Sequence, residues 1–323
     1  PSQPRRTGLT ATLPTGIYSI AKNVIGRESE LSIESVAILS PGDMGHAIGQ
    51  LLKENELRVL TCLSGRSART RELSEHAGIT DVPNLNELVE QSDVLMSVTI
   101  SEAVPGLCRE IADAVMATGT DLLFAECNAI APELSREMET VLSGAGARYV
   151  DASIIGGPPR NGSSPRIYVS GDNAVEFEQL REFGLDVRNL GAQLGRASGI
   201  KMCYAAMTKG TTALHAELLI AAEKMGLSEE LMAEFSGSQP AVVSRMEGWM
   251  PTMPAKSRRW VSEMEEIEKT FSDLGMTPNI FKGVADMYRM IGATSLGDEN
   301  PETRDKDRDL AETIRIIAEG TGD

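Results

Sequence analysis

The sequence is poor in the side chains that most often bind metal ions. It holds only three histidines among 323 residues. His46, His76 and His215 lack the spacing of a zinc site, and no EF-hand-like acidic loop is present. We therefore expect no metal site. The cysteines lie far apart in apolar segments, so free, buried thiols are expected at Cys62, Cys108, Cys127 and Cys203.

Positive charge and long apolar runs are scarce as well. Lys and Arg number 31 against 47 Asp and Glu, which gives a formal net charge of −16. This balance argues against a nucleic acid or an anionic membrane surface as the partner. No apolar run approaches the roughly 20 residues that a membrane-spanning helix needs. With 41% apolar residues, the chain is long enough for two domains, and its reduced thiols suit the cytoplasm.

Short β-branched apolar runs alternate with amphipathic segments from Ser35 to Gly195. This alternation predicts a parallel sheet with crossover helices. The expected strands cover residues 36–39, 58–62, 94–98, 122–125, 149–151, 167–169 and 186–190. The expected helices lie near residues 44–54, 67–77, 84–91, 103–117, 132–144 and 173–183.

After Gly195 the alternation stops and only helical patterns remain. Ser198 is expected to cap a long helix that ends at Gly226. A second helix is predicted by apolar residues spaced 4, 3, 4 and 3 apart, namely Trp260, Met264, Ile267, Phe271 and Leu274. We interpret this stripe as core or dimer packing.

These patterns predict an α/β Rossmann-type domain over residues 34–195 and an all-α domain over residues 196–323. Residues 1–33 show no periodic pattern of useful length. We interpret them as a tag or a loose extension, with a processed targeting segment as the alternative.

A glycine-rich turn follows the first predicted strand. It reads Ser40-Pro41-Gly42-Asp43-Met44-Gly45 and leads directly into a helix. This is a G-x-G-x-x-G turn with serine at the first glycine position. The second glycine lets the backbone approach a pyrophosphate, and the third lets helix and strand pack closely. The helix N-terminus offers free N–H groups to the phosphates. The turn predicts dinucleotide binding.

The segment after the second strand indicates which dinucleotide is bound. An NAD-selective site places Asp or Glu there to accept from the ribose 2′-OH. Residues 62–69 contain no acid. Arg66 offers a guanidinium that can stack on adenine and bind a 2′-phosphate, with Ser64 and Ser67 as further donors. The sequence therefore predicts NADP(H) as the cofactor.

The order of the motifs resembles the β-hydroxyacid dehydrogenase family, within the 6-phosphogluconate dehydrogenase superfamily, over residues 34–293. The family's G-L-G-x-M-G turn is similar to residues 40–45, and its D-x-S-T-x-x-P segment is similar to residues 126–132. Its D-A-P-V-S-G-G substrate loop is similar to residues 151–157. Its helix with the catalytic lysine is similar to Gly199-Ile200-Lys201-Met202. The resemblance implies a catalytic Lys201 and places Asn128 near the nicotinamide.

The chain also departs from the family pattern. The loop serine is Ile155, the asparagine four residues after the lysine is Ala205, and the K-D-L motif that helps to hold a substrate carboxylate is absent. Residues 258–267 resemble a subgroup with a phosphogluconate-dehydrogenase-like C-terminal domain. Relatives dimerise by interleaving the long helix and the helical tail, which implies a homodimer.

Lys201 begins a polar stripe on a mostly apolar helix. The stripe comprises Lys201, Tyr204, Thr208, Thr212 and His215, at offsets 0, 3, 7, 11 and 14. A cleft between the domains is expected to supply the partners that buried polar groups need. Desolvation there would bring the pKa of Lys201 towards the range useful for proton transfer. Lys209 lies off this stripe, and we expect it to face solvent or a partner subunit.

Other residues are expected to surround the reacting groups. Val98 and Thr99 follow the fourth strand and Asn128 follows the fifth, at the carboxyl edge where open α/β sheets bind ligands. A substrate carboxylate is expected to contact Ser153, Gly156 and Gly157 on their loop. Tyr204 is a further polar candidate, with aromatic packing as the alternative, and so is Arg160, with a solvated loop charge as the alternative.

The sequence thus predicts an NADP-dependent dehydrogenase or reductase that acts on a small hydroxy acid, keto acid or aldehyde. Lys201 is expected to donate or accept the proton while the cofactor carries hydride. An imine reductase or a decarboxylating dehydrogenase on the same fold is an alternative. A dinucleotide-binding regulatory protein without turnover is another, favoured by the departures at Ser40, Ile155 and Ala205.

Overall fold

The computed structural model describes residues 33–160 and 162–321. The predicted extension lies outside these residues except for Ile33, which is buried in the core. The described part of the first half forms one eight-stranded sheet of order β3-β2-β1-β4-β5-β6-β7-β8. Its strands are Ser35–Leu39 (β1), Arg58–Thr61 (β2), Thr80–Asp81 (β3), Val94–Ser97 (β4), Leu123–Glu126 (β5), Arg148–Ile155 (β6), Arg166–Ser170 (β7) and Asp186–Asn189 (β8).

The strands from β3 to β6 run parallel, as the sequence predicts. The expectation of a parallel sheet throughout is wrong at β7, which pairs antiparallel to β6 and parallel to β8. Only ten residues, 156–165, separate β6 from β7. So short a connection cannot carry a crossover helix, and the chain turns back on itself.

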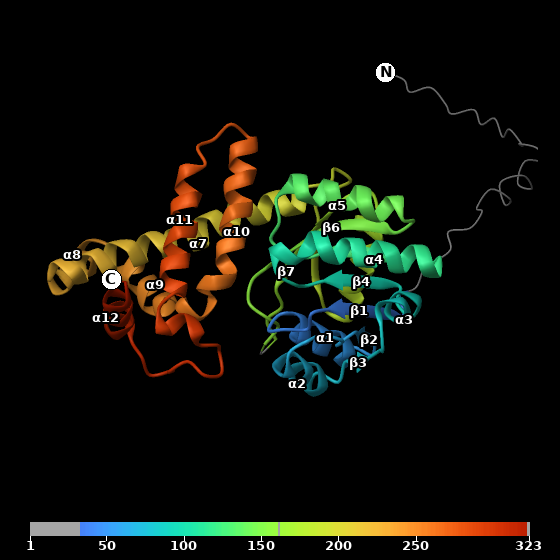
Figure 1. The fold of residues 1–323 in the computed structure, drawn as a ribbon, viewed down its shortest axis with the longest axis horizontal. Helices are drawn as coiled ribbons and strands as arrows, with labels where there is room; N and C mark the ends of the chain where they lie inside the picture. Colours follow the sequence, from blue (N-terminus) through green and yellow to red (C-terminus); the bar gives the residue numbers. More distant parts are fainter. Residues whose placement is uncertain (1–32, 161, 322–323) are drawn as a thin grey trace, which may run out of the picture. The chain divides into compact units, whose positions relative to one another are not determined.

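Helices cover both faces of the sheet, as Figure 1 shows. Alternate residues of β1 divide between two apolar cores, with Val36 and Ile38 in one and Ala37 and Leu39 in the other. The helices of this region are Gly45–Glu54 (α1), Ala68–His76 (α2), Leu85–Glu90 (α3), Val104–Thr118 (α4), Pro132–Gly144 (α5) and Ala174–Phe177 (α6), with 3₁₀ turns at Ser101–Ala103 (η1) and Glu178–Phe183 (η2). The core with Ile38 packs on α1 and α6, and the other packs on α3, α4 and α5.

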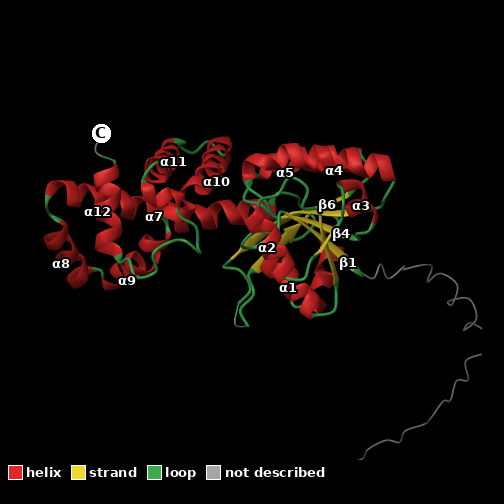
Figure 2. Cartoon of the chain, turned by 60° about the horizontal axis from the view of Figure 1, so that its bottom comes forward, coloured by secondary structure: helices red, strands yellow, loops and turns green. Residues whose placement is uncertain are grey.

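The second half contains helices and connecting loops, and no strand among its described residues (Figure 2). Its helices are Arg196–Met225 (α7), Ser228–Ser238 (α8), Pro240–Trp249 (α9), Pro254–Asp273 (α10), Asn279–Gly292 (α11) and Leu310–Gly320 (α12), with 3₁₀ turns at Met250–Thr252 (η3) and Ser295–Asp298 (η4). A third apolar core joins α7, α9, α10, α11 and α12. The fold class predicted from the sequence, a Rossmann-type α/β region followed by an all-helical region, is confirmed.

Three local expectations are corrected. Gly226 ends α7 in the left-handed conformation as predicted, but Ser198 lies within the first turn of the helix rather than capping it. Leu274 lies beyond α10 and is 70% exposed, so it does not belong to the core stripe. Cys203 is exposed on α7, whereas the other three cysteines are buried thiols as expected.

No helix among the described residues is both long and apolar enough to cross a membrane.

Candidate active site

The glycine-rich turn joins β1 to α1 at the carboxyl edge of the sheet. Ser40, at the first glycine position, has a φ of 59°, in the left-handed region that favours glycine. The N–H of Gly42 donates to the Ser40 carbonyl at 2.7 Å. A Cβ atom on Gly45 would come within 3.1 Å of Ile38 Cγ2 and of the Ser40 carbonyl oxygen. The third glycine therefore allows close packing of α1 on β1, as the motif requires.

The turn fits the pyrophosphate of a dinucleotide. A Cβ atom on Gly42 would meet nothing closer than 3.9 Å, so the space beside it is open. The backbone N–H groups of Asp43 and Met44 have no backbone acceptor among the described residues and lie at the N-terminus of α1. The Ser40 Oγ is buried and is likewise without a partner there. Free donors at a helix N-terminus suit a phosphate group.

The predicted contacts of the 2′-phosphate, Ser64, Arg66 and Ser67, lie in the loop after β2 and at the start of α2. Arg66 is half-buried and pairs with no acid of the described residues, so its charge is available to a ligand. Ser67 is the N-cap of α2 and accepts from the Thr70 N–H at 3.2 Å. Ser64 is exposed. Arg66 and Ser64 are therefore open to a ligand, whereas the Ser67 oxygen already caps a helix.

Arg69, which the sequence analysis did not single out, connects three distant segments. Its guanidinium donates to Asp43 of the glycine-rich turn at 2.5 Å. It also contacts both carboxylate oxygens of Glu302, each at 2.9 Å. From α10, Arg259 approaches the same Asp43 at 4.0 Å. Asp43 therefore ties the turn to α2 and to the helical region.

Asn128 holds together the loops at the ends of β4 and β5. Its Oδ1 accepts from the Thr99 N–H at 2.6 Å. Its Nδ2 donates to the Ser97 Oγ at 2.9 Å and to the carboxylate of Glu126. The amide thus fixes Thr99 beside the glycine-rich turn, where the Val98 N–H donates to a β1 carbonyl at 3.3 Å. Its predicted place beside the nicotinamide stays a prediction.

Glu126 is a buried acid to which sequence reasoning gave no role. Its side chain is completely shielded from solvent, and its Oε2 has no partner among the described residues. Burial raises the pKa of Glu126 to about 7, although hydrogen bonds from Asn128 oppose the shift. The signal in the sequence was an acid at the end of a buried strand.

Asp151 attaches α7 to the sheet. Its Oδ2 accepts from the backbone N–H groups of Gly195, Ala197 and Ser198, at 3.0 to 3.1 Å. The Ser170 hydroxyl donates to the same oxygen at 2.7 Å. An acid at a helix N-terminus satisfies free N–H groups and is favoured by the helix dipole. This contact fixes the first turn of α7 beside β6.

Lys201 lies one turn farther along α7. Its Nζ donates to the carbonyl oxygen of Ile154, near the carboxyl end of β6, at 2.5 Å. Because β1, β4, β5 and β6 are parallel, this end lies at the same edge of the sheet as the glycine-rich turn. Burial lowers the pKa of Lys201; Glu263 opposes this shift and Arg259 adds to it. The ammonium is thus largely desolvated and not in open solvent.

The predicted substrate-binding residues lie near this lysine in different settings. Residues 151–155 belong to strand β6, so the expectation of a loop there is wrong. The Ser153 Oγ is buried without a partner among the described residues, whereas Gly156 and Gly157 are exposed beyond the strand. Arg160 is exposed and forms an isolated bridge with Ser163.

The polar stripe on α7 differs from the expectation that its side chains find their partners in a cleft between the domains. Tyr204 is 46% exposed. The hydroxyls of Thr208 and Thr212 donate to carbonyls of their own helix, four residues earlier, at 3.0 and 2.8 Å. Their hydrogen bonds are therefore satisfied within α7 and call for no ligand. Whether Tyr204 contacts substrate stays a prediction.

The expectation for Lys209 is wrong. Its ammonium is buried and forms an ion pair with Glu263 of α10. Burial lowers the pKa of Lys209 to about 8, and Glu263 opposes the shift. The helical position of Lys209 alone did not reveal this, because its partner lies 54 residues farther along the chain.

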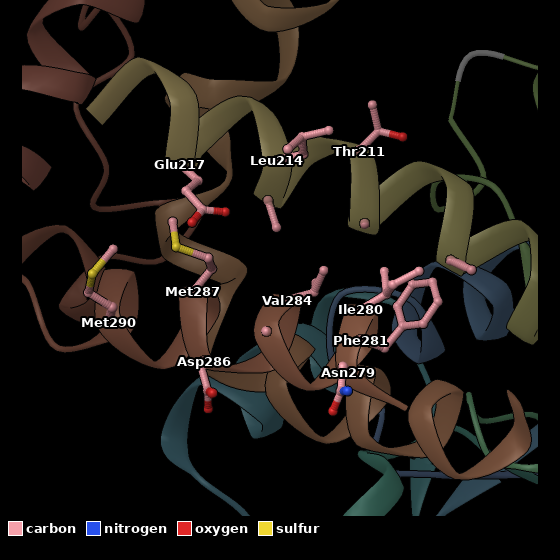
Figure 3. A pocket seen from close by; sticks show the side chains of 14 residues that line it. Thr211, Leu214, Glu217, Asn279, Ile280, Phe281, Val284, Asp286, Met287 and Met290 are labelled. Carbon is pink, nitrogen blue, oxygen red and sulfur yellow. The ribbon is translucent and has the colours of Figure 1, made fainter. Parts of the chain in front are cut away.

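A cavity of about 820 Å³ lies away from these groups, between α7 and α11 (Figure 3). Its lining is mostly apolar and includes Leu214 from one helix and Ile280, Val284 and Met287 from the other. Neither Lys201 nor the glycine-rich turn contributes to it.

Comparisons with known proteins agree with this architecture. Residues 35–184 match the NAD-binding domain of 6-phosphogluconate dehydrogenase, and residues 222–291 match a domain of unknown function (DUF1932). An uncharacterized 28.5 kDa protein in the 7S RNA 5′ region of Methanothermus fervidus is 25% identical over 261 residues, which cover 79% of this chain and 98% of that protein.

Two solved structures share the fold. The conserved protein MTH1747, of unknown function and structurally similar to 3-hydroxyacid dehydrogenases, is 26% identical with a TM-score of 0.59, over 80% of this chain and 96% of that one. A 3-hydroxyisobutyrate dehydrogenase of Mycobacterium tuberculosis, in a structure with L-serine, is 18% identical with a TM-score of 0.60, over 88% and 99%. Residues 35–184 are therefore similar to the NAD-binding domain of 6-phosphogluconate dehydrogenase, and part of the helical region is similar to a domain of unknown function.

Proposed function

We propose that the protein is an NADP-dependent oxidoreductase that interconverts a small hydroxy acid and its keto acid or aldehyde. The observation that carries the proposal is the position of Lys201. Its desolvated ammonium lies at the carboxyl edge of the sheet, the edge that also holds the glycine-rich turn. Ligands of open α/β sheets bind at this edge.

The residues at this edge have separate tasks. The N–H groups of Asp43 and Met44 and the Ser40 hydroxyl hold the pyrophosphate. Arg66 pairs with the 2′-phosphate, because it is a cation without an acidic partner among the described residues. When bound, NADPH supplies hydride to the carbonyl carbon of the substrate.

Lys201 delivers the proton that the reduction requires. Its ammonium donates to the carbonyl oxygen as that oxygen gains negative charge, and the neutral amine then takes a proton from water. The lowered pKa of Lys201 makes the donation easier. In the oxidation of an alcohol the neutral amine accepts the proton. The Ile154 carbonyl, 2.5 Å away, holds the amine in place in both directions.

Lys201→Met tests the catalytic role. NADPH consumption is followed by absorbance with a panel of keto acids, aldehydes and imines, and NADPH formation from NADP⁺ is followed with hydroxy acids. The variant is expected to lose about 100-fold or more in kcat with unchanged NADPH affinity. Lys269→Met, which removes an exposed lysine of α10, should keep its activity. Near-normal turnover of the Lys201 variant would rule the role out, and NADPH binding without turnover on any substrate would favour a regulatory binder.

Arg66→Ala tests the choice of cofactor. Loss of a charged hydrogen bond to the 2′-phosphate should weaken NADPH binding about 10- to 100-fold. NADH binding should weaken far less, because NADH loses only the stacking of the guanidinium on adenine. Isothermal titration calorimetry measures both affinities. Arg188→Ala, at an exposed arginine paired with Asp186, is the matched control. A protein that binds NADH more tightly than NADPH would contradict the assignment.

A further inference from the structure

An acid lies in the middle of the glycine-rich turn. Asp43 stands between Gly42 and Gly45, directly before the N-terminus of α1. The same turn fits a pyrophosphate, because the N–H groups of Asp43 and Met44 have no backbone acceptor among the described residues. A pyrophosphate is negatively charged, so a carboxylate beside it weakens binding unless a cation offsets the repulsion. The surroundings of the Asp43 carboxylate therefore affect how well the turn binds a dinucleotide.

The Asp43 carboxylate contacts arginines and not the N-terminus of α1. Its Oδ1 accepts from Arg69 Nη2 at 2.5 Å, and its Oδ2 lies 4.0 Å from Arg259 Nη1. Within residues 33–160 and 162–321, no side chain makes a cap hydrogen bond at Met44, the N-cap of α1. An aspartate next to a helix start readily accepts from free N–H groups there. The contact with Arg69 keeps Asp43 from occupying the groups that a pyrophosphate needs.

Arg69 is itself held from a second side. Its Nε and Nη2 donate to the two carboxylate oxygens of Glu302, each at 2.9 Å, a bidentate contact that fixes the plane of the guanidinium. The side chains of Arg69 and Asp43 are only 33% and 29% exposed, so water and salt screen their interaction less than that of a fully exposed pair.

The charges at the turn balance in this arrangement. Asp43 and Glu302 supply two negative charges, and Arg69 and Arg259 supply two positive ones. Removing Arg69 would leave two carboxylates near the turn with Arg259 as their remaining cation. It would also free the Asp43 carboxylate to turn towards the start of α1. Both consequences act against an anion bound at that helix N-terminus.

We propose that Arg69 is a positioning residue for the cofactor, which neutralises Asp43 and holds its carboxylate away from the N–H groups that bind the pyrophosphate. The inference rests on the proposed binding of a dinucleotide, but not on the proposed reaction. Arg69 thus has a different task from Arg66, which pairs with the 2′-phosphate. Because NADPH and NADH share the pyrophosphate, the loss of Arg69 weakens the binding of both.

A double-mutant cycle on the full chain tests this, with the affinities for NADPH and NADH measured by calorimetry at low ionic strength. Arg69→Met should weaken both affinities about 10-fold. In the Asp43→Ala background the same substitution should cost about threefold or less, because the carboxylate that it exposes is gone. Arg69→Lys keeps the charge and should stay within about threefold of the wild type. Arg289→Met, at an arginine of α11 that also joins two acids, should bind both nucleotides normally.

Salt gives a second readout, since the loss caused by Arg69→Met, relative to the wild type at the same salt, should shrink to about threefold in about 0.5 M NaCl. A loss for NADPH alone would overturn the inference, because Arg69 would then bind the 2′-phosphate. An equal loss in both backgrounds would overturn it as well.

Should Arg69→Met not fold, Asp43→Ala decides the question. It should bind both nucleotides at least as tightly as the wild type, and weaker binding would contradict the inference. Tight binding of NADPH without turnover on any substrate would refute the proposed reaction and leave the inference standing. A wild type that binds neither nucleotide would refute both.

Discussion

At the scale of single residues, two buried acids at the carboxyl edge have contrasting surroundings. Asp151 accepts from three backbone N–H groups of the start of α7 and from the hydroxyls of neighbouring serines. Glu126 is equally buried, but one of its oxygens has no partner among the described residues. Asp151 therefore joins the sheet to the helix that carries Lys201, whereas Glu126 is held at a cost in its ionised form.

Glu126 should make stability depend on pH. Because its pKa rises to about 7 in the folded chain, the folded state holds a proton that the unfolded state has lost. The free energy of unfolding therefore falls as pH rises from 5 through 7. Glu126→Gln keeps an acceptor for Asn128 and removes the charge. Relative to wild type, the variant should gain about 2–3 kcal/mol between pH 5 and pH 8.

Urea unfolding of both proteins at the two pH values measures this difference, since effects of all other groups cancel in the comparison. A difference that stays constant with pH would show that Glu126 titrates normally.

The sequence predicted some of these residues and missed others for a physical reason. Lys201 and the glycine-rich turn were found because they stand in local motifs next to strand and helix ends. Lys209 was assigned to solvent or a partner subunit, because its burial depends on Glu263 and Trp260 from a helix that is distant in sequence. Exposure of an amphipathic side chain is set by packing and not by its own helix.

At the scale of elements, the close packing of α1 on the sheet depends on two glycines. Gly45 and Gly49 lie one turn apart on the helix face that packs on β1. A Cβ atom on Gly49 would come within 2.6 Å of Ile79 Cδ1 and 3.2 Å of Ile38 Cδ1. The close approach of helix and strand positions the N-terminus of α1, and with it the proposed phosphate site.

Gly49→Ala should therefore destabilise the protein by about 1–2 kcal/mol, even though alanine favours helix, because the methyl group overpacks the interface. Gly106→Ala is the matched control within helix α4. A Cβ atom there would meet nothing within 4 Å, so it should stabilise by about 0.5–1 kcal/mol. Thermal unfolding compares the two. If Gly49→Ala stabilised the protein, the interface between α1 and the sheet would have space for a methyl group, and the prediction would be wrong.

The order of the elements followed from hydrophobic periodicity, but their pairing did not follow in every case. The missed strand β3 has only two residues, too few for a period to show. β7 carries the same apolar alternation whether it runs parallel or antiparallel, and the short segment after β6 decided its direction.

At the scale of the whole molecule, the homodimer expected from the sequence stays a prediction. We expect the dimer interface to include the apolar cavity between α7 and α11. Leu214 and Ile280 line it and are 58% and 62% exposed, which is unusual for apolar side chains of a monomer when they cluster. A two-fold interface buries such a patch against its own copy.

Sedimentation equilibrium should give twice the mass of the chain for the wild type and a single chain for Leu214→Glu. Met116→Glu, at a Met that is 61% exposed on α4, should stay dimeric. If the wild type sediments as a single chain at micromolar concentration, the predicted homodimer is wrong.

The sequence by itself determined the Rossmann-type region, the helical region after it, the glycine-rich turn between β1 and α1 and the lysine at the start of α7. Each of these depends on local periodicity, on glycines or on neighbours along the chain. Only the tertiary structure decided that β7 reverses, that Asp151 anchors α7, and that Glu263 pairs with Lys209. These contacts bring together residues that are far apart in the chain, and the pattern of a single segment does not encode what packs against it.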